Sequence, residues 1–178
     1  GHSNTAVGNE AMYGGTTGHR NTAVGNTALD AINTGDDNTA IGNGSMTINT
    51  SGQYNTAVGS ATLAASQTAN NNVAIGYQAL EQSTSGANNT AVGKGALNAI
   101  LTTGDNVAVG ANALDACTTS NNVAVGHNAL TSVSTGYNNT AVGSQAGSGC
   151  LSIGNTLMGA YAGDGAMTGN CNTVFGYY

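Results

Sequence analysis

The stretch NNTAVGKGAL, residues 88–97, contains the unit that decides the fold. Its centre is the tetrad Asn-Thr-Ala-Val followed by Gly, and variants of this tetrad recur along the whole chain. Successive copies start 17 residues apart, except for two intervals of 16 residues. We therefore predict a single repeat domain over residues 1–178. The leading asparagines are Asn4, Asn21, Asn38, Asn55, Asn72, Asn89, Asn106, Asn122, Asn139, Asn155 and Asn172.

Numbering each copy from its asparagine separates constant from variable positions. Position 5 is Gly in all eleven copies, and position 4 is Val or Ile in nine copies, with Met158 and Phe175 in the last two. Position 9 is Leu or Met in eight of ten copies, and position 14 is Ser or Thr in all ten complete copies. Positions 6, 7 and 10 to 12 vary widely. The constant positions therefore face an environment that repeats in every copy.

A unit of this length is too short for helix-turn-helix repeats, and its β-branched residues before a strict Gly favour a strand. We predict an all-β parallel β-solenoid, or β-roll, of about eleven 17-residue coils. Positions 2 and 4 fall on one face of the strand, and positions 1, 3 and 5 fall on the other. We expect position 4 to form a column inside the coil with the Leu and Met side chains of position 9. Position 1 is expected to form an asparagine ladder between coils.

This assignment leaves the small Ala, Gly and Asn face on the outside, where another backbone can approach closely. We therefore expect a homotrimer or another laterally packed oligomer, with Ala91 facing a neighbouring chain. The alternative is a head-to-tail filament, because the chain starts and ends within the repeat and without a polar cap.

Composition excludes several classes of function. Two basic residues, Arg20 and Lys94, against eight acidic ones give a net charge of −6, which disfavours binding to nucleic acid or to an anionic membrane. No apolar run approaches the roughly 20 residues that span a bilayer. The chain opens without an initiator Met, so no signal peptide is visible. Three scattered cysteines, Cys117, Cys150 and Cys171, predict neither a disulfide framework nor a metal site, and they leave the redox compartment open.

No constellation predicts an enzyme, a cofactor or a metal. Lys94 lies in AVGKGAL, which lacks the spacing of a phosphate-binding loop. His127 occupies the same variable position as Lys94, and His2 and His19 are expected in turns. No two histidines share a repeat with a carboxylate nearby. The aspartates are expected in turns for conformational reasons. They are Asp30, Asp36, Asp37, Asp105 and Asp115.

The NTAVG, NNVAIG and NNVAVG tetrads resemble the repeats of trimeric autotransporter adhesin heads of the YadA type, and also those of phage tail-fibre proteins. The resemblance covers residues 4–176. It implies left-handed parallel β-rolls assembled as trimers on a bacterial or virion surface. The unit of 17 residues is slightly longer than the adhesin repeat, and we expect no coiled-coil stalk, membrane anchor or chaperone domain within residues 1–178.

We therefore expect a structural and adhesive fibre module, extracellular or on a cell or virion surface, whose partners are itself and a host-surface receptor. A polymerising filament subunit is one alternative. An ice-binding solenoid is another, although its threonines at positions 2 and 14 are expected on different faces. Specific contacts are expected from tyrosines at variable positions, namely Tyr13, Tyr54, Tyr77, Tyr137 and Tyr161.

Overall fold

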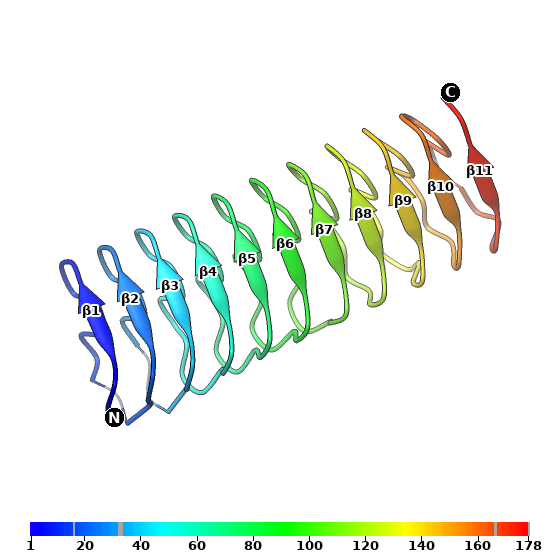
Figure 1. Cartoon of the computed structure of the whole chain (residues 1–178). Helices are drawn as coiled ribbons and strands as arrows, with labels where there is room; N and C mark the ends of the chain where they lie inside the picture. The colour runs from blue at the N-terminus through cyan, green and yellow to red at the C-terminus, as the bar shows by residue number, and fades with distance from the viewer. Residues whose placement is uncertain (16, 32–33, 166, 178) are drawn as a thin grey trace.

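The computed structural model describes residues 1–15, 17–31, 34–165 and 167–177. Over these residues it contains eleven strands and no helix, and the strands form one sheet in sequence order (Figure 1). Every neighbouring pair is parallel. The predicted parallel β-solenoid is confirmed, with ten turns joining eleven strands. These are β1 Thr5–Val7, β2 Thr22–Val24, β3 Thr39–Ile41, β4 Thr56–Val58, β5 Val73–Ile75, β6 Thr90–Val92, β7 Val107–Val109, β8 Val123–Val125, β9 Thr140–Val142, β10 Thr156–Met158 and β11 Thr173–Phe175.

The strands are paired so that equivalent positions of the repeat lie side by side. Ala23 of β2 pairs with Ala40 of β3, for example. The register survives a 16-residue interval, since Val107 of β7 pairs with Val123 of β8. The missing residue is therefore lost from the connecting segment and not from the sheet. Eleven strands at a spacing of about 4.8 Å give a sheet about 48 Å long.

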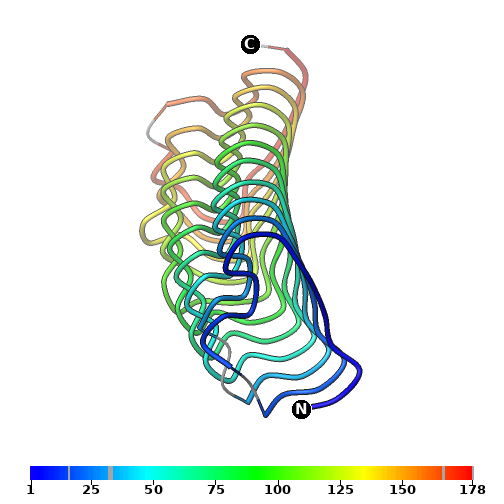
Figure 2. The same cartoon turned by 90° about the vertical axis from the view of Figure 1, so that its left-hand side faces the viewer.

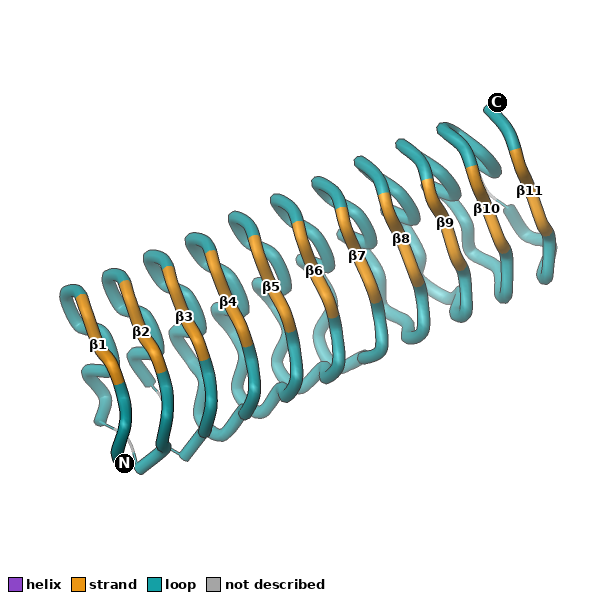
Figure 3. The backbone as a smooth tube through the Cα atoms, in the orientation of Figure 1, coloured by secondary structure: helices purple, strands orange, loops and turns teal. Residues whose placement is uncertain are grey.

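The segments between strands are also stacked and bonded, although they are not strands (Figures 2 and 3). The Leu29 N–H donates to the Ser45 carbonyl at 3.0 Å, and the Thr27 N–H donates to the Asn9 carbonyl at 2.9 Å. Such bonds join each coil to both of its neighbours. The backbone of the turns is therefore satisfied between coils, as it is in the sheet.

The turn after each strand adopts an uncommon backbone conformation at position 9. Leu29, Leu63 and Leu97 have φ values of 49°, 47° and 53°. Residues other than Gly, Asn and Asp rarely adopt this left-handed region. All three leucine side chains are fully buried. Burial of the leucine column and the bonds between coils therefore hold a conformation that local preference disfavours.

The prediction of which strand face lies inside was wrong. The alanines at position 3 are fully buried, as Ala23, Ala57 and Ala91 illustrate, whereas the position 4 residue Val7 is 56% exposed and Ile41 is 40% exposed. The leucine column at position 9 is inside, as expected, and faces the alanines across the thin coil. A second large side chain at position 3 would not fit in that space. Ala91 therefore faces the interior of its own chain and not a neighbour.

One coil shows how tightly this interior volume is set. Leu157 replaces the usual alanine at position 3. Glycine replaces the leucine of position 9 in its own coil, at Gly163, and in the preceding coil, at Gly147. A Cβ added at Gly147 would lie 2.5 Å from Leu157 Cδ1, and one at Gly163 would lie 2.9 Å from Leu157 Cδ2. The leucine side chain therefore fills the space that two missing side chains leave.

The asparagine ladder forms as predicted, but inside the coil. Asn55 Nδ2 donates to Asn38 Oδ1 at 3.1 Å and to the carbonyl of Ala69 at 2.7 Å, which lies across its own coil. Asn38 Oδ1 also accepts from the Asn55 N–H at 3.0 Å. Each buried amide thus finds partners in two coils, which offsets the cost of removing it from water. The ladder also ties the strand to the segment that returns along the same coil.

Candidate binding surfaces

The outer face of the sheet carries positions 2 and 4 of every coil. Position 2 contributes threonine in eight copies and valine in three, and position 4 contributes branched aliphatics followed by Met158 and Phe175. Along the described strands these side chains are half-buried or exposed, and none is charged. We call this surface the strand face. It is an uncharged strip with two parallel files of side chains, and it follows the full length of the rod.

A second surface follows the residues that precede each asparagine, at positions 16 and 17, and we call it the polar edge. The residue at position 17 has a positive φ, as in Asp37, Asn71 and Asn88. Asn and Asp tolerate this conformation better than other side chains, which explains their frequency here. The polar edge thus carries the charged and amide side chains that the strand face lacks.

Stacking brings together charged residues of the polar edge that are 17 residues apart. Arg20 donates from Nε to Asp37 Oδ1 at 2.6 Å and from a terminal nitrogen to Asp37 Oδ2 at 2.7 Å. The hydrogen bond from Arg20 holds the pKa of Asp37 below its usual value, and the same bond raises the pKa of Arg20. The ring centroids of His2 and His19 lie 4.0 Å apart, and the backbone N–H of His19 donates to Asp36 Oδ1 at 2.7 Å. Stacking of successive coils thus brings His19 of one repeat beside Asp36 of the next.

The tyrosines do not gather at one place. Tyr13, Tyr54, Tyr77 and Tyr137 are exposed, and they occupy positions 10, 17, 6 and 16 of different coils. Tyr161 is half-buried, and its ring packs edge-to-face against Tyr177 at 5.9 Å. A single aromatic patch is therefore not formed by these five residues.

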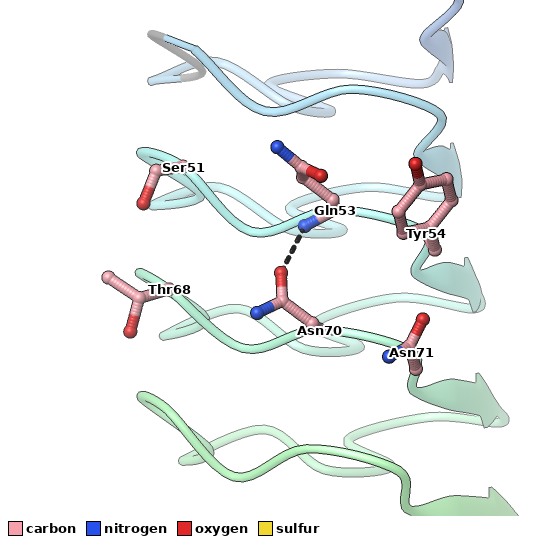
Figure 4. A pocket seen from close by; sticks show the side chains of 6 residues that line it. All are labelled: Ser51, Gln53, Tyr54, Thr68, Asn70 and Asn71. Atoms are coloured by element: carbon pink, nitrogen blue, oxygen red, sulfur yellow. Dashed lines mark hydrogen bonds between the residues drawn. The ribbon is translucent and has the colours of Figure 1, made fainter.

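Tyr54 differs from the other tyrosines because it lines a hollow of about 520 Å³ (Figure 4). The hollow lies on the polar edge between two successive coils. A smaller hollow of about 120 Å³ is lined by Leu101, Thr102, Thr103 and Thr118. The larger hollow is lined by Ser51, Gln53, Tyr54, Thr68, Asn70 and Asn71.

The remaining chemical groups are dispersed. Lys94 and His127 are exposed at position 6, and no group of three or more His, Cys, Asp or Glu side chains with a metal-binding arrangement occurs among the described residues. Cys117 and Cys150 are buried thiols and Cys171 is an exposed one, with no disulfide among them. Burial raises the pKa of the Cys117 thiol. No helix in the described ranges is long and apolar enough to cross a membrane.

The fold and its surfaces define this chain as a β-solenoid repeat protein. No protein-family model, curated protein or solved structure matches it.

Proposed function

We propose that this chain is a structural fibre module, a rigid rod outside the cell or on a cell or virion surface that associates side by side with copies of itself. The observation that carries the proposal is the strand face, an uncharged and largely apolar strip along the whole rod. Large apolar strips on otherwise polar proteins mark interaction sites. The contact face is thus the Thr and Val side of the sheet, in place of the alanine side expected from the sequence.

The dimensions of the strand face suit self-association. The sheet is about 48 Å long, and two files of side chains cover a width of about 10 Å. A pair of chains would therefore bury about 1,000 Å² in total, near the lower limit for a specific protein interface. Two copies also share the same coil spacing, so their files stay in step along the whole contact. A homotrimer, which the adhesin-like repeat implies, would place three such faces around one axis.

Sedimentation equilibrium of the purified chain tests this proposal. We expect a discrete oligomer, with a trimer favoured. The double variant Val109→Asp with Val125→Asp should dissociate it, because both side chains lie on the strand face. Leu101→Asp is the matched control, since Leu101 is 52% exposed but lies outside the sheet. A monomeric wild-type chain with an intact fold contradicts the proposal, and a mass that rises without limit identifies a head-to-tail filament instead.

Ice binding is a second candidate, and one observation favours it. The face that carries the Thr file of position 2 and the aliphatic file of position 4 is exposed to solvent, whereas the sequence predicts it inside the coil. A regular, uncharged face with hydroxyl and methyl groups can order water in a lattice. Thermal hysteresis of the wild type, lost in Thr90→Lys and kept in Thr102→Lys, is the expected result for this function. No hysteresis together with a stable oligomer excludes it.

A further inference from the structure

We propose that the hollow between Gln53, Tyr54, Asn70 and Asn71 binds a neutral oligosaccharide. This inference rests on the proposed function, because it gives the rod its receptor chemistry. The hollow of about 520 Å³ is large enough for a sugar residue, and its lining residues are uncharged.

The first support is the placement of Tyr54 itself. Position 17 requires a left-handed backbone, and Tyr54 has a φ of 58°. Asn71 and Asn88 occupy the same position in the next two coils with φ values of 57° and 60°. A tyrosine is strained here by comparison, and its side chain is 58% exposed, so burial does not offset the strain. The bond from the Tyr54 N–H to the Asp36 carbonyl holds this backbone, but it does not require an aromatic side chain here. An exposed aromatic residue at a position that disfavours it points to a function for the ring.

The second support is the chemistry around the ring. Tyr54 and Asn71 are exposed on successive coils, and Gln53 and Asn70 are half-buried beside them. Asn70 Oδ1 accepts from the Gln53 N–H at 2.7 Å, which fixes its amide (Figure 4). The amide groups of Gln53 and Asn71 make no hydrogen bond within the described structure, so their donors and acceptors are available to a ligand.

This combination fits a sugar ring. A pyranose has an apolar C–H face, which stacks on an aromatic ring, and a rim of hydroxyl groups, which pair with planar amides. The backbone that lines the hollow is also held by bonds between coils. The Tyr54 N–H donates to the Asp36 carbonyl at 3.1 Å, and the Asn71 N–H donates to the Gln53 carbonyl at 3.0 Å. A rigid site loses little entropy when it binds.

The neighbouring charges favour a neutral ligand over an acidic one. On the coil before Tyr54, Asp37 is paired with Arg20, while Asp36 lies 3.9 Å from the same guanidinium. Two carboxylates share one cation, so the local net charge is negative. Sialylated chains should therefore bind more weakly than neutral chains of hexose or N-acetylhexosamine.

The test uses the full chain in its native assembly on an immobilised panel of neutral and sialylated oligosaccharides, followed by calorimetry with the best neutral ligand. We expect a dissociation constant of about 1 mM or tighter for the wild type, and Tyr54→Asn should weaken it at least tenfold, or by about 1.4 kcal/mol. Tyr54→Phe keeps the stacking face and should stay within about threefold of the wild type. Tyr13→Asn removes a tyrosine that is 78% exposed on another coil, and binding should not change.

Folding of the key variant is not at risk, because Asn is the residue that neighbouring coils place in this conformation. Its melting temperature should equal or exceed that of the wild type. Absence of neutral binding, a preference for sialylated chains, or unchanged binding in Tyr54→Asn overturns the inference. Sedimentation of the same samples separates the two proposals. A monomer that binds through Tyr54 refutes only self-association, and an oligomer without glycan binding refutes only this site.

Discussion

The two faces of each strand come from the same triplet of residues, yet they differ in the size and burial of their side chains. On the inner face Ala91 is fully buried and its equivalents are nearly all alanine, whereas on the strand face the larger Val92 remains half-exposed. Hydrophobicity alone would bury the valine. The coil is so thin, however, that a leucine from the opposite wall already fills the interior. Available volume, and not hydrophobicity, therefore decides which face is buried.

The buried asparagine ladder should give the largest effect on the inner side. Asn72 Nδ2 donates to Asn55 Oδ1 at 3.2 Å and to the Gly86 carbonyl at 2.8 Å, and Asn72 Oδ1 accepts from the Asn89 N–H at 2.8 Å. Asn72→Ala leaves these partners unsatisfied in the core. We expect the free energy of unfolding to fall by about 3 to 5 kcal/mol, measured by chemical denaturation.

The control for this variant is a pair of asparagines at position 6 of adjacent coils, outside the core. Asn26 is exposed and accepts from Asn43 Nδ2 at 3.0 Å. Asn26→Ala should change stability by no more than about 0.5 kcal/mol. Equal losses of unfolding free energy in the two variants would mean that burial does not determine the contribution of these asparagines.

A substitution toward the common repeat sequence should destabilise the tenth coil. Leu157→Ala restores the residue found at position 3 in nine copies, but Gly147 and Gly163 leave no leucine to fill the resulting cavity. We expect a loss of about 3 kcal/mol in the free energy of unfolding. A neutral or stabilising result in thermal melts would contradict the conclusion that the available interior volume decides which side chains are buried. Leu157→Met, which conserves volume, should cost less than about 1.5 kcal/mol.

Isoleucine introduced on either face of β6 compares the two faces, adding three carbons at Ala91 and one at Val92. Ala91→Ile overfills the interior and should cost about 2 kcal/mol. Val92→Ile introduces the residue that Ile41 and Ile75 already provide at this position, and it should stay within about 0.5 kcal/mol of the wild type. Urea titrations of both variants measure the difference. A larger loss of unfolding free energy in Val92→Ile than in Ala91→Ile would contradict the conclusion that interior volume is the limiting quantity.

The smallest effect is expected at Asp115, at position 10, which belongs to neither face. Burial raises the pKa of this carboxyl above 3.8, its ordinary value. The folded state therefore holds the proton more tightly than the unfolded state, and stability falls as the pH rises from about 3.8 through the folded pKa. Asp115→Asn should raise stability at pH 7 by no more than about 0.5 kcal/mol, because the group is partly screened by solvent.

The pH dependence is the check on this last prediction. The melting temperatures of the wild type and Asp115→Asn should converge near pH 3, where the carboxyl is protonated in both states. A difference that persists at pH 3 would assign the effect to packing instead of charge.

Much of the fold could be predicted because the residues that specify it recur in every repeat. The asparagine spacing located every strand, and the leucines of position 9 were placed correctly in the core. Leu157 together with Gly147 carries a further signal in the sequence, since a large residue at position 3 appears where position 9 has no side chain. That exchange indicates that positions 3 and 9 share one space inside the coil.

The candidate sites were less accessible from the sequence. Tyr54 was one of five tyrosines with no reason to rank first, and the contact of His2 with His19 arises only when variable positions are stacked. A closer comparison of position 17 across the copies would have found one aromatic residue among a majority of Asn and Asp.

By itself, the sequence determined the period, the strands, the parallel in-register stacking and the asparagine ladder, because these depend on residues that recur within every copy. Only the tertiary structure decided which side of the strand lies inside and which side chains meet on the polar edge. The reason is physical: facing depends on the width of the coil and on what fills it from the opposite wall. Neither quantity can be read from the strand alone.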